Sequence, residues 1–341
     1  MLLSELTALR GPAGCEHEVR AALRREAERL LEGCEGARVY SDTMGNLYAH
    51  RPGTDKAKKH VMLCAHMDEV GFIVRFATEE GLLRFASVGG VDPRVIASRR
   101  VLLGEKRIPG VIGFKAVHLM TDEEYECAPG YDMLSIDIGA TSKEEAEKLC
   151  PPGTYATFDS AYREFGDGFV KAKALDDRVG CMVLLHALEH SAYAGDMTCV
   201  FTVQEECGLR GAKIAANRVK PDLALIMEGT TANDMGDVPE HLQVTTCGKG
   251  AVISVMDKSV IMDHRLREFA MNTAQKRGIP AQYKRAVAGG TDGGPIHLSG
   301  TGIPCLVMAA PCRYIHSPAG VCKMSDVEAL MALTVAMLEE L

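Results

Sequence analysis

Continuous apolar runs, with little polar alternation, mark many of the predicted β-strands of this chain. Such runs occur at residues 60–65, 197–203, 223–227, 252–256 and 303–308. Strands that are apolar on both faces are typical of parallel sheets covered by helices. Segments that we predict as helices occupy much of the rest, at residues 2–10, 16–31, 181–188, 211–219, 261–276 and 325–341. The pattern predicts an α/β fold.

Residues 70–163 follow a different pattern. Short β-like runs, separated by Gly, Asp and Pro turns, occur at residues 71–76, 82–85, 100–103, 109–113 and 134–138. We interpret this stretch as a small β-rich domain inserted into a larger α/β domain, which consists of residues 1–69 and 164–341. Ser142 with Glu145, and Ser325 with Glu328, each predict a capping box at the start of a helix.

Composition limits the possible partners. The chain has 341 residues, 47% of them hydrophobic and 25% charged, as expected of a soluble globular protein. The formal net charge of -8 argues against a nucleic acid or an anionic membrane as partner. No apolar run approaches the roughly 20 residues of a membrane helix.

The cysteines and the N-terminal residues favour a cytoplasmic location. The 12 cysteines are scattered, several lie in apolar runs, and no C-x-x-C pair occurs. This usage is typical of free thiols in a reducing cytosol. The first five residues lack the basic start and the apolar core of a signal peptide.

Candidate chemistry begins where the apolar run 60–65 ends, at His66 and Asp68. Ligands of parallel sheets bind at the carboxyl ends of the strands. His66 could bind a metal ion while Asp68 accepts the second N–H of its ring. The alternative is a plain polar turn.

Adjacent acids, Glu205 and Glu206, follow the run 197–203. Adjacent carboxylates repel, so a buried pair needs positive charge nearby. One could bind a metal ion while the other transfers a proton. The alternative is a solvated acidic loop.

Another pair of acids, Asp176 and Asp177, stands at the start of a predicted helix. Asp177 could cap this helix, and Asp176 could bridge two cations. His186 and His190 share a helix face, but no Glu follows His186 as H-E-x-x-H requires, so we interpret both as packing or surface residues. The Gly-rich loop 289–294 is no dinucleotide fingerprint and favours close approach of backbone to a substrate.

Five candidate ligands gather at one predicted edge of the sheet. They are two histidines and three carboxylates: His66, Asp176, Glu206, Glu228 and His316. With one carboxylate shared, they give each of two metal ions three protein ligands and leave open positions for water and substrate, as in a hydrolytic site. Glu205 is then free to act as general base. Zn and Co are both compatible with such ligands, and Mn is not excluded.

Four sequence runs together resemble the tetrahedral-assembly metallo-aminopeptidases, the glutamyl aminopeptidase-like peptidases of which some carry an endoglucanase label. The runs are C-A-H-M-D-E-V-G at 64–71, A-L-D-D-R at 174–178, Q-E-E-C-G-L-R-G at 204–211 and G-T-D at 290–292. The resemblance extends over essentially the whole chain. It implies a zinc-exopeptidase-like α/β sandwich with an inserted PDZ-like domain used for self-assembly, and a hollow dodecamer built from dimers.

The resemblance also implies roles for single residues. His66, Asp176 and Glu228 would hold one ion, while Asp176, Glu206 and His316 would hold the other. Glu205 would be the catalytic acid/base, and Asp68 would orient His66. One departure is Gly293, where Ala is expected; it implies a change in loop flexibility or pocket shape.

The predicted function is a dinuclear metal-dependent aminopeptidase that releases N-terminal residues from short peptides by metal-activated water. A deacylase or carboxypeptidase on the same site is the main alternative. A glycoside hydrolase needs two carboxylates free of metal, and the chain has no Trp for a sugar platform. A catalytically idle scaffold is disfavoured because every expected ligand and Glu205 are present. The preferred N-terminal side chain, the native metal and the physiological substrates stay open.

Overall fold

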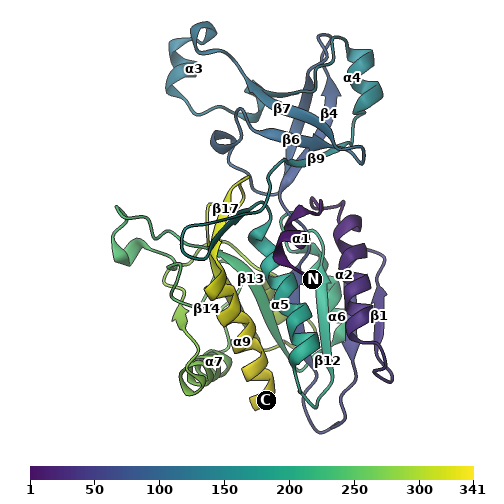
Figure 1. Cartoon of the computed structure of the whole chain (residues 1–341), viewed down its shortest axis with the longest axis vertical. Helices are drawn as coiled ribbons and strands as arrows, with labels where there is room; N and C mark the ends of the chain where they lie inside the picture. Colours follow the sequence, from purple (N-terminus) through teal and green to yellow (C-terminus); the bar gives the residue numbers. More distant parts are fainter.

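The computed structural model covers residues 1–341 and consists of an α/β body with a β-barrel at one end (Figure 1). The body contains an 11-stranded mixed sheet with the strand order β1-β2-β12-β3-β13-β16-β17-β11-β10, and β14 and β15 extend it beside β16. Its strands are β1 Arg38–Ser41, β2 Leu47–Arg51, β3 Val61–His66, β10 Arg163–Phe165, β11 Phe169–Ala172, β12 Met197–Thr202, β13 Leu223–Thr231, β14 Ala251–Ile253, β15 Ala281–Tyr283, β16 Cys305–Arg313 and β17 Gly320–Lys323.

The centre of the sheet is parallel, as the continuous apolar runs predict. β3 lies between β12 and β13, and β13 pairs with β16, all in parallel. Every residue of β3 and β12 is buried, because helices cover both faces. β13 is longer than predicted, so Glu228 lies inside this strand and does not end it.

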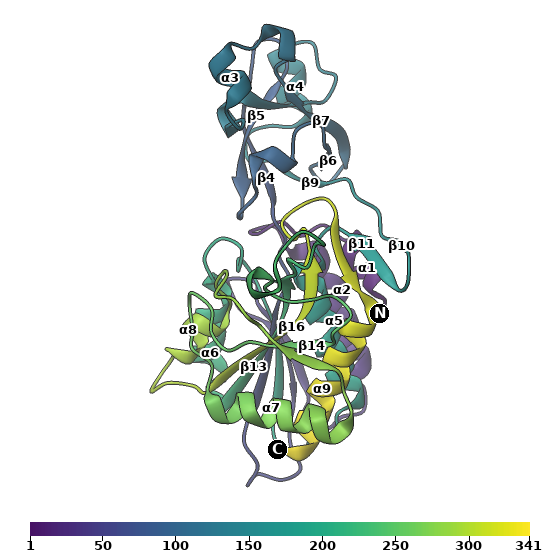
Figure 2. The same cartoon turned by 90° about the vertical axis from the view of Figure 1, so that its left-hand side faces the viewer.

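Helices cover the two faces of the sheet, with α2, α5 and α9 on one side and α6 and α8 on the other (Figure 2). The body's helices are α1 Leu3–Ala8, α2 His17–Leu30, α5 Leu175–His190, α6 Arg210–Val219, α7 His264–Arg277, α8 Gly293–His297 and α9 Met324–Glu340. A core of 60 buried residues fills the layers. None of the helices is long and apolar enough to span a membrane.

The barrel consists of six antiparallel strands in the closed order β4-β5-β8-β7-β6-β9. They are β4 Gly71–Ala77, β5 Leu83–Val88, β6 Arg100–Leu103, β7 Ile108–Phe114, β8 Leu134–Asp137 and β9 Tyr155–Phe158, and two short helices accompany them, α3 Asp122–Glu126 and α4 Lys143–Leu149. The ring of Phe72 packs edge-on against Phe85 and Phe158 in a separate apolar core of 18 residues. These strands lie within the predicted insertion, and the α/β fold with an inserted β-rich domain is confirmed. The hydrophobic pattern did not predict β9.

The two predicted capping boxes differ in outcome. Ser142 caps α4 by accepting the backbone N–H of Glu145, although the Glu145 carboxylate accepts from the backbone N–H of Thr141 and not from that of Ser142. The second prediction is wrong, because α9 begins at Met324 and Ser325 lies inside its first turn. Strand β17 leads directly into this helix, which leaves no room for a separate capping residue.

Candidate metal centre

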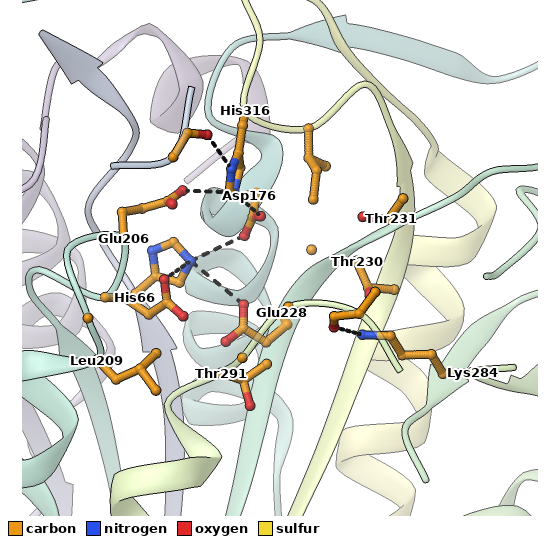
Figure 3. A pocket seen from close by; sticks show the side chains of 18 residues that line it. His66, Asp176, Glu206, Leu209, Glu228, Thr230, Thr231, Lys284, Thr291 and His316 are labelled. Carbon is orange, nitrogen blue, oxygen red and sulfur yellow. Dashed lines mark hydrogen bonds and ion pairs between the residues drawn. The ribbon is translucent and has the colours of Figure 1, made fainter. Parts of the chain in front are cut away.

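All predicted site residues except Asp68 line one cleft at the edge of the central parallel strands (Figure 3). The cleft has a volume of about 360 Å³ and is lined by 18 residues. His66 is the last residue of β3, Glu205 and Glu206 follow β12, and Glu228 lies in β13. Asp176 stands in the first turn of α5, and His316 follows β16.

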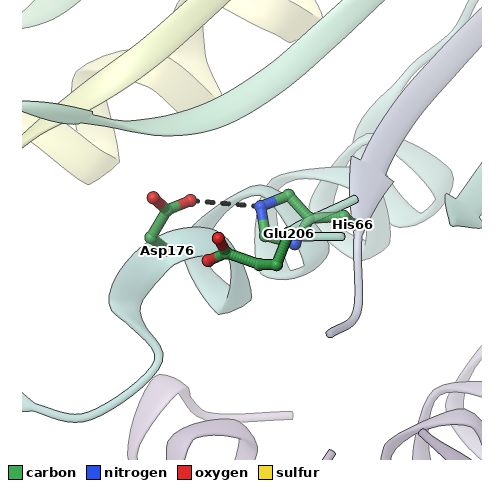
Figure 4. A group of neighbouring side chains, drawn as sticks. All are labelled: His66, Asp176 and Glu206. Carbon is green, nitrogen blue, oxygen red and sulfur yellow. Dashed lines mark hydrogen bonds and ion pairs between the residues drawn. The ribbon is translucent and has the colours of Figure 1, made fainter. Parts of the chain in front are cut away.

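Asp176 lies between the two histidines. Its Oδ1 is 3.2 Å from Nε2 of His66, and its Oδ2 is 3.6 Å from Nε2 of His316. Glu228 approaches the first histidine, with Oε2 3.7 Å from Nε2 of His66, and Glu206 approaches the second, with Oε1 3.3 Å from Nε2 of His316. Figure 4 shows how Asp176 and Glu206 converge on His66. The site therefore has two halves that share one carboxylate.

Burial and mutual repulsion set the electrostatics of the site. Burial raises the pKa of Glu206 to about 7 and raises the pKa of Glu228 well above its ordinary value. Burial alone would lower the pKa of His66, but the carboxylates of Glu205 and Asp176 raise it well above the usual histidine value. Added cations would relieve the repulsion between these carboxylates and favour their ionised forms.

The donor atoms fit divalent metal ions. Oε1 of Glu228 is buried and has no hydrogen-bond partner. Oxygen and imidazole donors from several residues lie within 4.8 Å of one another in three groups: His66, Asp176 and Glu206; His66, Glu205 and Glu228; Asp176, Asp177 and Glu228. Carboxylate and imidazole ligands suit divalent transition metals. By distance alone, Glu205 and Asp177 could also be metal ligands. The hydrogen bonds of each side chain help to distinguish candidate ligands from supporting residues.

Asp177 caps its helix, as one reading of the sequence predicted. Its Oδ1 accepts the backbone N–H of Gly180 at 2.8 Å, and its Oδ2 accepts the backbone N–H of His66 at 3.2 Å. One carboxylate thus fixes the start of α5 against the end of β3. Both Asp176 and Asp177 have non-helical backbone angles, which turn the Asp176 side chain toward the cleft, where it lies among the lining residues.

Asp68 supports the site in a way that differs from the prediction. Its backbone carbonyl, at 3.1 Å, is the acceptor for Nδ1 of His66, whereas its carboxylate oxygen is 3.6 Å from that atom. The Asp68 carboxylate instead accepts the backbone N–H groups of Glu205 and Glu206, at 3.0 and 3.1 Å. Asp68 therefore orients His66 through its backbone and holds the acidic pair through its side chain.

A buried ion-pair network lies beneath the cleft. Glu69 accepts from Lys173 at 2.8 Å and contacts Arg178 at 3.4 Å, and Arg178 donates to the carbonyl of Met67. These contacts join the end of β3 to the start of α5, the two elements that carry His66 and Asp176. The sequence pattern indicated no role for these residues, although Glu69 and Arg178 stand within two or three positions of predicted ligands.

Two glycines that the sequence analysis did not single out shape the site. The carbonyl of Gly90, at the barrel's junction with the body, accepts from Nδ1 of His316 at 2.8 Å. A Cβ on Gly229 would lie 3.1 Å from Cα of Asp176, so a glycine here lets α5 approach β13. The V-G-G-V run around Gly90 was the available signal for the first of these contacts.

The Gly-rich loop lines the cleft with Gly289, Gly290 and Thr291, as expected for close backbone approach. Gly293 lies outside the cleft, where a Cβ would meet Val260 and Val307 at 3.2 Å. The departure at this position therefore affects packing and not the shape of the pocket, which was one of the two expected effects. Burial raises the pKa of Asp292 to about 6, and its Oδ2 accepts from the Thr202 hydroxyl.

His186 and His190 take no part in the site. Their rings stack with centroids 4.1 Å apart. They lie in the last turns of α5, whereas Asp176 lies in its first turn. The prediction that these two histidines are packing or surface residues is confirmed.

The comparisons with known proteins agree on one family. A model of the M42 glutamyl aminopeptidase family matches residues 45–333. The lysyl aminopeptidase of Pyrococcus furiosus is 33% identical over 317 residues, which are 89% of this chain and 87% of that protein.

Solved structures agree with the sequence match. An aminopeptidase from the archaeon Desulfurococcus kamchatkensis has a TM-score of 0.93 and 34% identity, covering 99% of this chain and 94% of its own. The TET1 peptidase of Pyrococcus horikoshii, described as assembling into a tetrahedron or a large octahedral shell, has a TM-score of 0.86 and 34% identity, covering 99% and 98%. The resemblance drawn from the four sequence runs is thereby confirmed. The chain belongs to the M42 glutamyl aminopeptidase family, a family of metal-dependent peptide hydrolases.

Proposed function

We propose that this protein is a dinuclear metal-dependent aminopeptidase that removes N-terminal residues from short peptides. The observation that carries the proposal is the position of Asp176, whose two oxygens face one histidine each. A carboxylate in this position suits a bridge between two ions. Each half of the site then has three ligands, and the rest of the cleft is open to substrate.

In this proposal His66, Asp176 and Glu228 hold one ion, and Asp176, Glu206 and His316 hold the other. Zinc or cobalt suits these ligands best. When bound, such ions would lower the pKa of water and polarise the scissile carbonyl. The acidic end of the cleft favours a substrate with a free α-amino group over one whose amine is acylated.

Glu205 is the proposed general base. Its side chain is 11% exposed and lies beside the proposed ligands, with Oε2 4.0 Å from Nε2 of His66, and desolvation raises the pKa of Glu205 well above its ordinary value. Glu205 takes a proton from the attacking water and passes it to the leaving amine. Asp68 holds the backbone at this position by accepting the N–H of Glu205.

The test is hydrolysis of aminoacyl-nitroanilides by metal-stripped protein, with Zn or Co added back. We expect metal-dependent release from free-amine substrates and none from N-acetylated ones. Release only from acylated substrates would instead indicate a deacylase. In a parallel assay, cleavage of peptides with a free C-terminus but not of C-blocked peptides would indicate a carboxypeptidase. No release with any metal would contradict the proposal.

We also propose that the barrel directs self-assembly into a dodecamer, supported by the shells described for the Pyrococcus horikoshii relative. Figure 1 shows the barrel projecting from the body. It carries exposed apolar side chains at Val117, Leu119 and Tyr125. We expect Leu119→Asp to give smaller particles by native mass spectrometry, with Ile214→Asp on α6 as the control. Particles of unchanged mass in both variants would contradict the proposal.

A reducing compartment, the cytoplasm, is the proposed location. All 12 cysteines are free, and Cys312 and Cys322 face each other across paired strands without forming a disulfide. Fractionation of the native cells checks this location.

A further inference from the structure

Lys284 is the only lysine or arginine among the residues that line the metal-site cleft. It directly follows β15, and its backbone N–H continues the pairing by donating to Ile253. The side chain is only 8% exposed. Figure 3 shows Lys284 on one side of Glu228 and His66 on the other, so the ammonium group and the proposed metal ligands face the same space.

The Lys284 ammonium is largely without partners. It donates to the backbone carbonyl of Ala288 at 3.1 Å and forms no ion pair within the chain. An ammonium has three N–H donors, so two remain for another group. Burial lowers the pKa of Lys284. An anionic partner would therefore stabilise the charged form of this buried amine.

Nearby carboxylates are committed elsewhere. Asp257 is the carboxylate whose charge acts most strongly on Lys284, and it accepts from the hydroxyls of Ser259 and Thr291. Glu228 and Asp176 belong to the proposed metal site. The chain therefore offers the Lys284 ammonium no uncommitted carboxylate.

The surroundings of Lys284 suit a polar side chain. Thr230 and Thr231 follow Glu228 along β13 and also line the cleft, as does the backbone of Gly289 and Gly290. Only 3 of the 18 lining residues are hydrophobic. A Leu or Phe side chain at this place would leave the Lys284 ammonium in an apolar contact without a partner.

We propose that Lys284 selects peptides whose N-terminal residue is acidic, Glu or Asp, by pairing with the side-chain carboxylate of that residue. This inference rests on the proposed aminopeptidase function. The names of the family and of its Pyrococcus furiosus member refer to oppositely charged residues, glutamyl and lysyl. Whether this chain prefers an acidic or a basic N-terminal residue therefore has to be inferred from its own cleft.

The experiment compares Glu-nitroanilide with Gln-nitroanilide, which has nearly the same shape and no charge. The metal-loaded wild type should favour Glu by about 10- to 100-fold in kcat/KM, the range for a hydrogen bond to a charged group. Lys284→Met should abolish this ratio by lowering kcat/KM for Glu-nitroanilide to about that for Gln-nitroanilide, and Lys284→Glu should favour Lys-nitroanilide. Lys213→Met, on α6, removes an exposed charge as the matched control and should change nothing.

Two results would overturn the inference: equal rates on Glu and Gln substrates in the wild type, or a Lys284→Met variant that loses activity on all substrates equally. No hydrolysis of any substrate would instead count against the proposed function. In that case calorimetry on the metal-loaded protein decides, because L-glutamate should bind more tightly than L-glutamine to the wild type but not to Lys284→Met. Equal binding of the two amino acids to the wild type would overturn the inference.

Discussion

The barrel and the body differ in what they bury. The barrel joins antiparallel strands around 18 apolar residues, with Phe72 at the centre of an aromatic cluster. The body has a larger apolar core of 60 residues, yet it also buries ionisable side chains at the ends of its central strands. His66, Asp68, Asp177 and Glu228 are each less than 5% exposed.

The core of the barrel is thus almost entirely apolar, whereas the body also holds the ionisable groups that chemistry requires. A buried charge destabilises a fold unless it is paired or bound to a metal. The barrel avoids the cost, whereas the body offsets it with a large core, the Glu69 network and, in our proposal, two metal ions. Strongly shifted pKa values at one strand edge are typical of functional sites. The contact between Gly90 and His316 is where the two domains meet at the site.

The largest effect is expected from Glu205→Gln, which removes the proposed general base and keeps its shape. Turnover should fall by about 10²- to 10⁴-fold, because Gln cannot accept a proton from water. Metal content by elemental analysis should equal that of the wild type, since Glu205 is not a proposed ligand. Turnover within a few-fold of the wild type would remove Glu205 from the mechanism.

The barrel should respond most strongly to Phe72→Ala, with a loss of about 3–5 kcal/mol in its unfolding free energy. The truncation leaves a cavity between Phe85 and Phe158. Hydrogen exchange of residues 71–158 measures the effect, and metal affinity should not change. Phe76→Ala, in the same strand but 47% exposed, is the control. Equal losses in the two variants would show that the aromatic cluster does not hold the barrel together.

Metal loading should stabilise the body alone. A ligand at 100 times its Kd stabilises the folded state by about 2.7 kcal/mol, and here it also relieves repulsion among Asp176, Glu206 and Glu228. Comparing hydrogen exchange with Zn and with a chelator should show added protection in β3, β12 and β13, and none in the barrel strands. Asp176→Asn should lose most of this protection. Equal added protection in the barrel and in the body would contradict the expectation that metal binding stabilises the body alone.

Asp68→Asn tests the support beneath the acidic pair. An amide keeps the size of the carboxylate but weakens acceptance of the Glu205 and Glu206 N–H groups. Changes of this kind in residues behind a metal site typically cost 10–100-fold in metal affinity or activity, which is about the loss expected here. Kinetics at saturating metal separate the two effects. An unchanged kcat/KM would assign Asp68 to backbone support of His66 alone.

Much of the sheet could be predicted because its strands are buried on both faces. β3 and β12 lie within about one residue of the predicted runs. The end of β13 could not be predicted in the same way, since its last residues stay in the sheet only through pairing with β16. Ser325 failed as a cap for a similar reason, because the preceding strand, not the local sequence, sets the start of α9.

The gathering of the candidate ligands in one place could be predicted because strand ends of a parallel sheet meet at one edge. Gly90 and Lys284 escaped prediction because neither lies at the end of such a central strand. Gly90 contacts His316 only because the barrel packs against the body. Lys284 enters the cleft from β15, an edge strand. Distant segments brought together by packing leave no local pattern in the sequence.

The smallest effect, and the sharpest test of the contact between domains, is Gly89→Ala. Gly89 has φ +88°, and a Cβ there would lie 2.9 Å from Val70 and 3.1 Å from Glu206. Gly139 in the barrel has φ +77° with nothing within 4 Å, so Gly139→Ala isolates the backbone cost. Both substitutions should cost about 1–2 kcal/mol of stability. Only Gly89→Ala should also reduce kcat/KM, because it displaces Glu206 and the neighbouring Gly90 carbonyl. If both variants keep full activity, the barrel affects the site only through assembly.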